Sequence, residues 1–483
     1  MTETQPDHPI PPERAVATLQ VHSRGEARDV DLTRDPPFGW WPAIVIGLVA
    51  FVDRVEINLV AGALPAIQEH FGISDTVAGA IPTAASIAAA LLLLPAGRLA
   101  DRAPRVGAIA IVVLVWALCS VLSGLASSFA LFFLIRIAIG AAGQLYNPPA
   151  SSLIADYYPS SSRGKAFGFE RAGYYMGLPA GVIVGGAVAE ALDWRAVFFV
   201  AAIPGLLVAA LVWTVREPRR GLGDEIDALR AGRAGAAGSG VAASASVSGS
   251  AVSGSAGAEG SLSSTPPTHG PTPARGALIA EARGLLTIAT LRGVIASQAM
   301  LALGVAGLFY WLPTFLERTE GLDHDAAAGL AGGVGGTGIV IGIVLGSRLG
   351  DRARADGWRI AVAAWFLLAG AIGLTLAVTL PGLGLRVTLI AAACAGFAGA
   401  IPNLTAAAAD VVPSQSRGMG FAVLQFLTTL GGAFGPFLIG LTSDLLDSLP
   451  LAMLVLLPPL FACVVILRAA RKTFDADVAA AHP

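Results

Sequence analysis

The sequence predicts an all-α polytopic membrane protein with 12 transmembrane helices. Hydrophobic residues make up 55% of the 483 residues and charged residues only 13%, and the mean hydropathy is +0.70. Apolar runs of about 20 residues, the length that crosses a bilayer, recur along the whole chain. Lys and Arg gather in alternate connections between these runs. Because water-soluble domains show neither pattern, we expect the bilayer to be the solvent of this fold.

The composition also excludes several classes of protein. A net charge of −2 leaves no basic excess to neutralise phosphates, so we expect no nucleic-acid partner. The three cysteines lie inside apolar runs without metal-ligand spacing, and five of the six histidines lie in predicted tails or loops. We therefore expect no metal, no cofactor and no enzyme active site. A channel would need filter residues repeated around an axis, which this sequence does not offer.

The twelve spans are placed by their length and hydropathy. Those of the first half cover 40–66, 76–97, 105–126, 129–155, 164–190 and 194–215. Those of the second half cover 288–316, 326–348, 358–380, 386–410, 417–445 and 449–469.

The distribution of basic residues sets the predicted topology. The connections that follow even-numbered spans are rich in Arg and Lys, whereas the opposite side has only Arg195, Arg318 and Arg386. We therefore expect a multi-pass protein of the inner (plasma) membrane with both termini in the cytoplasm. Residues 1–39 are polar and lack the apolar core of a signal peptide, so they predict a cytoplasmic tail, and residues 470–483 predict a second one.

One long connection divides the spans into two groups of six. Residues 216–287 predict a cytoplasmic linker, and 231–275 consist almost wholly of Ala, Gly, Ser, Thr and Pro. Such a segment buries too little apolar surface to offset its ordering entropy, so we expect it to be disordered. The linker separates a six-helix bundle at 40–215 from a second at 288–469.

The two bundles are predicted to be repeats of each other. The segment Arg98-Leu99-Ala100-Asp101-Arg102 recurs as Arg348-Leu349-Gly350-Asp351-Arg352, at an offset of 250. Asp156, Pro159 and Arg163 recur as Asp410, Pro413 and Arg417, at an offset of 254. Agreement in separate segments indicates two homologous halves with the same orientation in the membrane.

This architecture of two six-helix pseudo-repeated bundles resembles the major facilitator superfamily (MFS fold). Gly97-Arg98-Leu99-Ala100-Asp101-Arg102, followed by Arg105, looks like that superfamily's signature loop between helices two and three. The resemblance implies a cytoplasmic gate, in which carboxylates and guanidinium groups latch the outward-facing state. The alternative is that these are ordinary cytoplasmic loop charges. The candidate gate residues are Gly97, Asp101, Arg102, Arg105, Asp156, Arg163, Asp351, Arg352, Asp410 and Arg417.

Helices five and eleven are rich in glycine and carry a proline. Glycines spaced by four form a flat face on which helices of opposite halves could rock. The arrangement resembles the Gly-Pro motif of antiporters in the superfamily, although tight packing accounts for it equally well. The candidate hinge residues are Gly177, Pro179, Gly181, Gly435 and Pro436.

Charged residues inside the predicted spans are the main candidates for a transport site, because each costs about 2.5–3.5 kcal/mol to insert. They occur in the first half, as Asp53, Arg54, Glu56, Arg136, Glu170 and Arg171. At about 1.5 Å per residue, Asp53 and Arg136 lie at similar depth and could pair. Glu56 shares a helix face with Asp53, so two carboxylates near one arginine could exchange a proton as that arginine engages substrate. The alternative is a structural salt bridge that merely permits insertion. The second half offers uncharged groups for a cavity wall, namely Gln298, Tyr310, Trp311, Asn403 and Gln425.

Several segments also look like the Spinster family of lipid transporters. These are Asp53-Arg54 in helix one, Arg216-Glu217-Pro218 after helix six, and Tyr310-Trp311 in helix seven. The resemblance implies that Asp53 responds to protons and that Arg136 binds an anion. Where the family has Gly-Glu in helix four, this chain has Gly143-Gln144, and glutamine cannot titrate. We hypothesise that Glu170 supplies the missing carboxylate; the alternative is a surface glutamate beside Arg171.

Together these resemblances imply a secondary transporter that works by alternating access, is driven by protons and acts as a monomer. The expected substrate is amphiphilic, with a lysolipid-like or organic anionic head held by the charged first half and a tail against the apolar second half. The alternatives are an organic-anion symporter or a multidrug exporter of the same superfamily.

Overall fold

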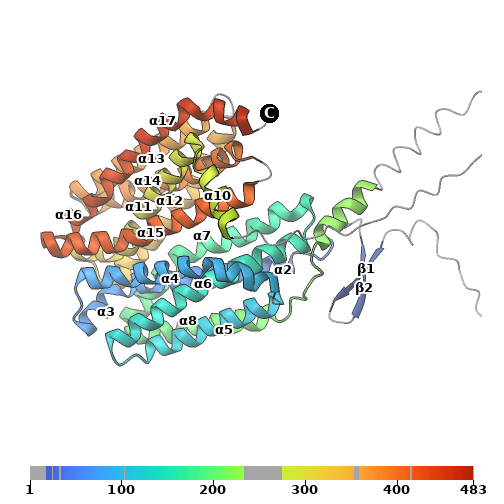
Figure 1. Ribbon diagram of the computed structural model, residues 1–483. Coiled ribbons are helices and arrows are strands. Elements are labelled where there is room, and N and C mark those ends of the chain that lie inside the picture. Colours follow the sequence, from blue (N-terminus) through green and yellow to red (C-terminus); the bar gives the residue numbers. More distant parts are fainter. Residues whose placement is uncertain are drawn as a thin grey trace, which may run out of the picture.

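The computed structural model describes residues 34–102, 104–232, 275–352, 358–413 and 416–481, together with two strands within 18–31. For the strands and for 93–102, 144, 275–279, 417 and 418 it describes the backbone alone. The chain forms two helical bundles that lie side by side, the first half blue to green and the second yellow to red (Figure 1).

The first bundle contains six long helices and one short one. They are α2 (Trp41–Gly62), α3 (Leu64–Phe71), α4 (Asp75–Arg102), α5 (Arg105–Gly124), α6 (Phe129–Tyr157), α7 (Ser160–Ala191) and α8 (Trp194–Val212). The short helix α3 ends at Gly72, which has a positive φ of 63° and so closes the helix as only glycine does easily.

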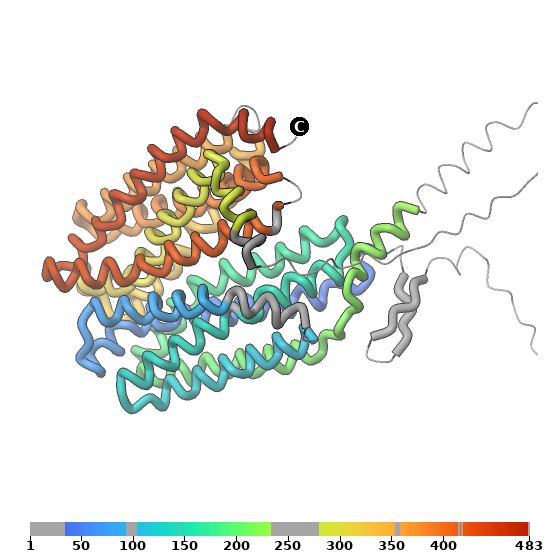
Figure 2. The backbone as a smooth tube through the Cα atoms, in the orientation of Figure 1, coloured from blue at the N-terminus to red at the C-terminus, as the bar shows by residue number. Residues whose placement is uncertain are grey.

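The second bundle repeats this order after a long connection. Its helices are α11 (Ala289–Glu320), α12 (His324–Arg352), α13 (Trp358–Thr379), α14 (Leu383–Val411), α15 (Arg417–Leu446), and the sixth in three pieces, α16 (Leu449–Met453), η2 (Leu454–Leu456) and α17 (Leu457–Ala481). The predicted C-terminal tail at 470–483 is therefore helical as far as Ala481 (Figure 2).

Eleven helices among the described residues are long and apolar enough to cross a membrane. The twelfth crossing is α2, which has 22 residues but carries Asp53, Arg54 and Glu56. Its charges lower its hydropathy, yet its residues pack inside the bundle like those of the other spans. The two-bundle architecture of twelve helices is confirmed.

The connections differ from the prediction in three places. The predicted signature loop is the last part of α4, since that helix continues to Arg102, and α12 likewise continues to Arg352. Residues 18–31 of the predicted tail form an antiparallel hairpin of β1 (Thr18–Ser23) and β2 (Glu26–Asp31). The predicted linker contains helices at 222–232 and at α10 (Arg275–Leu285). The remainder of the segment predicted to be disordered, 233–274, lies outside the described residues.

The helices of the two halves pack in the same arrangement. The halves contact each other through two equivalent helix pairs, which we call the seams. Within the halves, α2 packs on α7 as α11 packs on α15, and α4 packs on α6 as α12 packs on α14. Between the halves, α4 packs on α15 and α7 packs on α12. We call the end of the molecule that carries α3 and α16 the α3 end, and the opposite end, where the segment between the halves enters, the linker end (Figure 1).

Glycines of α7 pack against α2 of the same half. A Cβ atom on Gly173 would collide with the backbone of Gly47, one on Gly177 with Phe51, and one on Gly181 with Val55. The same holds in the second half, where Gly435 lies against Leu303 of α11. These glycines therefore join helices within a half, which favours the tight-packing alternative over a face on which the halves rock.

The two candidate hinge prolines, in contrast, lie at the seams between the halves. Pro179 of α7 contacts the positions of Gly332 and Gly336 on α12. Pro436 of α15 faces Gly79 of α4 through its carbonyl oxygen. The facing glycines allow the close approach of the helices at these two places.

Replacing Gly173 by valine tests the packing of α2 on α7. We expect it to lower the stability of the detergent-purified protein by about 1–3 kcal/mol, because the added methyl groups overlap the Gly47 backbone. The thermal unfolding midpoint measures the effect. Gly168→Val is the matched control, because it lies in the same helix with open space around it. Equal midpoints for the two variants would contradict this account of the contact.

Candidate functional site

The first charged group inside the bundle is an ion pair between adjacent residues of α2. The Arg54 guanidinium donates to Asp53 Oδ2 from Nε at 2.8 Å and from Nη2 at 2.5 Å. The side chain of Asp53 is 3% exposed and that of Arg54 is 15% exposed. Arg54 is thus the member of the pair that solvent or a bound molecule can reach.

Aromatic side chains of two other helices complete this pair. The guanidinium of Arg54 lies 4.7 Å from the ring centroid of Tyr174 on α7. Tyr146 of α6 is buried and hydrogen-bonds to Asp53. We call Asp53, Arg54, Tyr146 and Tyr174 the α2 cluster. Neither tyrosine was a predicted site residue, because aromatic residues at helical spacing give no signal that separates core from site.

The second charged group is a buried pair between Glu56 and Arg136. Nη1 of Arg136 lies 2.8 Å from Glu56 Oε1, and its Nη2 donates to the Glu56 carbonyl at 2.9 Å. Ser120 adds a hydroxyl 3.1 Å from Glu56 Oε2. The predicted pairing of Asp53 with Arg136 is therefore wrong. Depth alone could not distinguish Asp53 from Glu56, which are three residues apart, and helix rotation decides which carboxylate faces Arg136.

Glu170 of α7 lies at the edge of the α2 cluster. Its side chain is 12% exposed and its carboxylate is 3.3 Å from the guanidinium of Arg171, which points outward with 63% exposure. Glu170 also lies within electrostatic reach of Arg54 and Asp53. The side chain of Gln144 lies outside the described part of the chain, although its backbone belongs to α6. The neighbouring Gly143 is in contact distance of Asp53 Oδ1.

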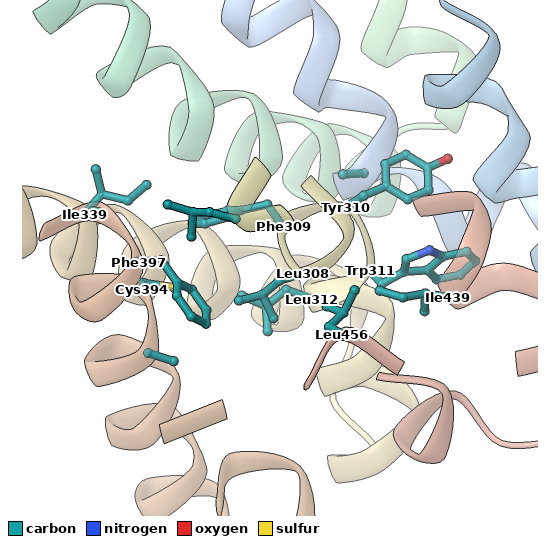
Figure 3. Packing of buried hydrophobic residues seen from close by; sticks show 14 of the residues in the cluster. Leu308, Phe309, Tyr310, Trp311, Leu312, Ile339, Cys394, Phe397, Ile439 and Leu456 are labelled. Carbon is teal, nitrogen blue, oxygen red and sulfur yellow. The ribbon is translucent and has the colours of Figure 1, made fainter. Parts of the chain in front are cut away.

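Two predicted wall residues of the second half are packed rather than exposed to a cavity. Trp311 is fully buried and its indole Nε1 donates to the carbonyl of Pro436 at 2.9 Å. The Tyr310 hydroxyl donates across the seam to the carbonyl of Ala78 at 2.8 Å. Figure 3 shows both rings within an apolar cluster that includes Leu308, Leu312 and Ile439. In this conformation they seal the molecule instead of lining a binding space.

The other three wall residues differ among themselves. Asn403 is buried and donates to the carbonyls of Gly346 and Gly399, both at 3.0 Å, so it joins α12 to α14. Gln425 is exposed and bonds to Thr429 of its own helix. Gln298 is buried, and its amide nitrogen has no hydrogen-bond partner among the described residues. Of the predicted wall residues, Gln298 and Gln425 therefore retain polar groups that a ligand could use.

The predicted gate charges of the first half bind within their own half. Arg105 is buried and pairs with Asp156 of α6 and, at 2.8 Å, with Glu217. Arg163 pairs with Asp224 of the helix at 222–232, at 2.7 Å. These contacts fasten α5, α6 and the start of the long connection into one unit at the linker end. Glu217 was not predicted as a gate residue, since only the tertiary fold brings it to Arg105.

The second half contains the repeat of one of these pairs. Arg359 bonds to Asp410 at 3.0 Å, and both residues lie 254 positions after Arg105 and Asp156. Asp351 and Arg352 lie exposed at the end of α12. The side chains of Gly97, Asp101, Arg102 and Arg417 lie outside the described residues. Where they are described, the gate pairs therefore join helices within a half, and a latch between the halves stays a prediction.

A polar latch between the halves lies instead at the α3 end. Asp75, at the start of α4, receives hydrogen bonds from Arg318 of α11 at 2.7 and 2.8 Å and from Ser443 of α15 at 2.7 Å. In return, Asp444 accepts from the backbone N–H groups of Asp75 and Thr76 at 3.1 and 2.8 Å. We call these five residues the α3-end latch. One sequence signal could have indicated it, because Arg318 is among the few basic residues predicted on that side.

The sealed part of the seam reaches from the latch to the level of the α2 cluster. Thr83 donates across the seam to the carbonyl of Ala433 at 2.5 Å, eight residues into α4, or about 12 Å from the latch. Asp53 lies nine residues before the end of α2, or about 14 Å from the α3 end. The Asp53–Arg54 pair therefore lies at about the same depth as this hydrogen bond between the halves.

Substituting Arg318 by glutamine tests the latch. Because Arg318 is partly exposed, we expect the loss of its charge-assisted hydrogen bonds to favour separation of the α3 end by roughly tenfold. Spin labels at Leu192→Cys and Leu445→Cys, in a background without the native cysteines, report the distance between the halves by pulsed electron resonance. A longer-distance population should appear in nanodiscs.

Arg195→Gln is the matched control for this experiment. Arg195 lies at the same end but contacts only groups of the first half that are described, namely His70, Trp194 and the Ala126 carbonyl. Its substitution should leave the distance distribution unchanged. If Arg318→Gln and Arg195→Gln gave the same distribution as the parent, the latch would not hold the halves together.

Comparison with known proteins places the chain in a family. A model described as the Major Facilitator Superfamily matches residues 46–436. The gallate transporter of Pseudomonas putida is 26% identical over 433 residues, covering 88% of this chain and 90% of the relative. Protein spinster homolog 1 of Xenopus laevis is 32% identical over 181 residues, covering 36% and 34%. The puromycin resistance protein pur8 of Streptomyces alboniger is 35% identical over 175 residues, covering 35% and 34%.

The chain thus spans about a third of the length of the spinster and puromycin relatives in these matches. A solved structure of a bacterial homologue of the human lysosomal transporter Spinster, inward-facing and unoccupied, superposes with a TM-score of 0.65 at 22% identity, covering 92% of this chain and 97% of that one. That likeness concerns the fold, which agrees with the two bundles described above. The protein belongs to the major facilitator superfamily and is a membrane transporter.

Proposed function

We propose that the protein is a proton-coupled secondary transporter that carries an organic anion with an apolar body by alternating access. The observation that carries this proposal is the Asp53–Arg54 pair. It lies about halfway along the helices, with a buried acid and a partly exposed base, at the depth of the Thr83 hydrogen bond between the halves. Transporter sites of this fold class lie near the bilayer midplane at the interface between repeats.

The pair suggests how a proton and an anion could be coupled. While Asp53 is ionised, it occupies the guanidinium of Arg54 through two hydrogen bonds. When Asp53 takes up a proton, its charge is lost and Arg54 is left without an anionic partner, which is costly inside the bilayer. A carboxylate or phosphate of the substrate can then take the place of Asp53. One proton and one negative charge would therefore bind together.

Alternating access follows from the two ends of the molecule. At the α3 end the latch and the Thr83 hydrogen bond join the halves. At the linker end, Arg105 with Asp156 and Arg359 with Asp410 each join helices within one half. We infer that this is the state open toward the linker side, which the sequence predicts to be cytoplasmic. Release of the latch and closure of the linker end would produce the opposite state.

The proposed substrate is an amphiphile of the lysolipid type. Its anionic head would bind Arg54 and Tyr174, and its tail would lie against the second half, where Gln298 and Gln425 are the polar groups left for contact. Spinster proteins are among the relatives, and the resemblance of Asp53-Arg54 and Tyr310-Trp311 to that family of lipid transporters supports a lipid-like substrate.

An organic-anion symporter is the second candidate. It is favoured by the gallate transporter, which matches along 88% of this chain. The same Asp53–Arg54 exchange would serve an aromatic carboxylate, so uptake by proteoliposomes should be compared for a lysophospholipid and for gallate. Flux of the lysolipid alone supports the first proposal and flux of gallate alone supports the second. Flux of neither in a sealed, oriented preparation would reject both substrates.

Asp53→Asn tests the coupling. In proteoliposomes, a pH gradient of one unit should drive about tenfold accumulation by the parent if one proton accompanies each anion. The asparagine variant should exchange substrate without accumulating it, because its side chain resembles the protonated state. Asp193→Asn, an exposed carboxylate in the connection between α7 and α8, is the control and should accumulate normally. Gradient-driven accumulation by Asp53→Asn would exclude Asp53 as the proton carrier.

Glu170→Gln tests the second carboxylate of this region. We propose that Glu170 exchanges a proton with the α2 cluster, because its side chain is largely buried and lies within electrostatic reach of Arg54. The variant should lower gradient-driven accumulation severalfold and shift the pH profile of uptake. Glu190→Gln, an exposed carboxylate of the same helix, is the control and should have little effect. Unchanged proton-driven uptake in Glu170→Gln would remove Glu170 from the mechanism.

A further inference from the structure

A groove runs along the outer face of the second half, between α13 and α17. Its floor and walls are the apolar residues Ala361, Ala364, Trp365, Leu368 and Leu467. Arg468 and Arg471 form its charged end. It lies away from both seams between the halves, because α13 and α17 pack on each other and on α11 and α14 of the same half. It is therefore a feature separate from the proposed transport site.

The charged end of the groove carries two guanidinium groups on one face of α17. Arg468 and Arg471 are three residues apart and exposed. Within the described part of the chain, neither forms an ion pair with a carboxylate. Arg471 instead lies 4.9 Å above the ring centroid of Trp358, the first residue of α13. Two adjacent exposed cations without an acidic partner repel each other weakly, and an anion bound between them would turn that repulsion into attraction.

The repeat shows that the fold does not require these arginines. At the offset of 254, which also relates Pro204 to Pro458 in the sixth helices, the equivalents of Arg468 and Arg471 are Thr214 and Glu217. Glu217 turns inward and neutralises Arg105. In the second half the equivalent position is basic and faces the groove. The pair of arginines at the end of the groove is therefore specific to the second half, and helix packing alone does not explain it.

Two exposed tryptophans beside the groove are typical of the level at which a membrane changes from hydrocarbon to head groups. Trp358 and Trp365 are 49% and 62% exposed, as interfacial tryptophans commonly are. From the arginines toward the α3 end, the exposed surface of α17 is apolar, as at Val465 and Phe461. Lys472 follows the arginines and is also exposed. An apolar trough with a cationic rim at this level is complementary to a lipid that has an anionic head.

We propose that this groove binds one anionic phospholipid of the leaflet at the linker end. Its phosphate would lie between Arg468 and Arg471, and one acyl chain would follow the trough over Ala361 and Ala364 beside Trp365. Small side chains at 361 and 364 leave the depth for the chain, and the tryptophan forms a wall. The lipid would neutralise the two arginines and fasten α17 to α13.

The test measures lipid retained by the full-length protein in native mass spectrometry. Detergent-purified protein is offered dioleoyl phosphatidylglycerol, dioleoyl phosphatidylcholine or glycerol phosphate. The anionic lipid should bind with a stoichiometry of one and be preferred over the zwitterionic one. Arg468→Gln with Arg471→Gln should reduce its bound fraction roughly tenfold or more, given about 1 kcal/mol for each basic residue. Substituting lysine at both positions should restore most of the binding.

Two further variants separate the head from the chain and control for charge. Trp365→Ala should weaken binding of both phospholipids while keeping the preference for the anionic one. Lys165→Gln with Arg283→Gln removes two other exposed cations, outside the groove, and should leave binding unchanged. Equal binding of the two phospholipids, unchanged binding in the double glutamine variant of the groove, or glycerol phosphate binding as strongly as the lipid would each overturn the proposal.

Discussion

Three charged side chains of α2 can remain inside the bilayer because each has a partner of opposite charge. Asp53 and Arg54 neutralise each other, and Glu56 is neutralised by Arg136 of α6. An unpaired charge at this depth would cost several kcal/mol, so the Glu56–Arg136 pair, which joins two helices, fixes how α2 is rotated about its own axis. That rotation turns one face of the helix toward the glycines of α7 and brings Arg54 beside Tyr174. The packing of α2 in the first half therefore depends on the neutralisation of its charged side chains.

The two pairs serve different purposes because their surroundings differ. Glu56 and Arg136 are both almost completely buried, and Ser120 adds a further hydrogen bond, so no exchange partner can reach them in this conformation. Arg54 remains partly exposed, and its partner is the adjacent residue rather than one on another helix. Breaking that pair separates no helices. It is therefore the pair that can open and close as a substrate arrives without weakening the bundle.

The internal repeat supplies a common frame on which the halves have diverged. The seams α4–α15 and α7–α12 are symmetric, and Arg105–Asp156 has its counterpart in Arg359–Asp410. Among the described residues, the ion pairs near the middle of the helices belong to the first half, whereas two exposed cations of the second half, Arg468 and Arg471, lie on an outer groove. The latch at the α3 end uses Asp75 from one half and Arg318 from the other, which have no relation through the repeat. The helix packing is thus symmetric between the halves, whereas the placement of the charged groups is not.

The sequence by itself determined the twelve spans, the division into halves, the repeat and the location of membrane charge in the first half. These follow from hydropathy and spacing, which act along the chain and can be read residue by residue. Only the tertiary structure decided that Arg136 binds Glu56, that Glu217 binds Arg105, and that Trp311 seals rather than lines a cavity. Partner choice depends on helix rotation and on contacts between distant segments. Asp53 and Glu56 are three residues apart and share a helix face, so the hydropathy pattern does not say which of the two carboxylates faces a given arginine.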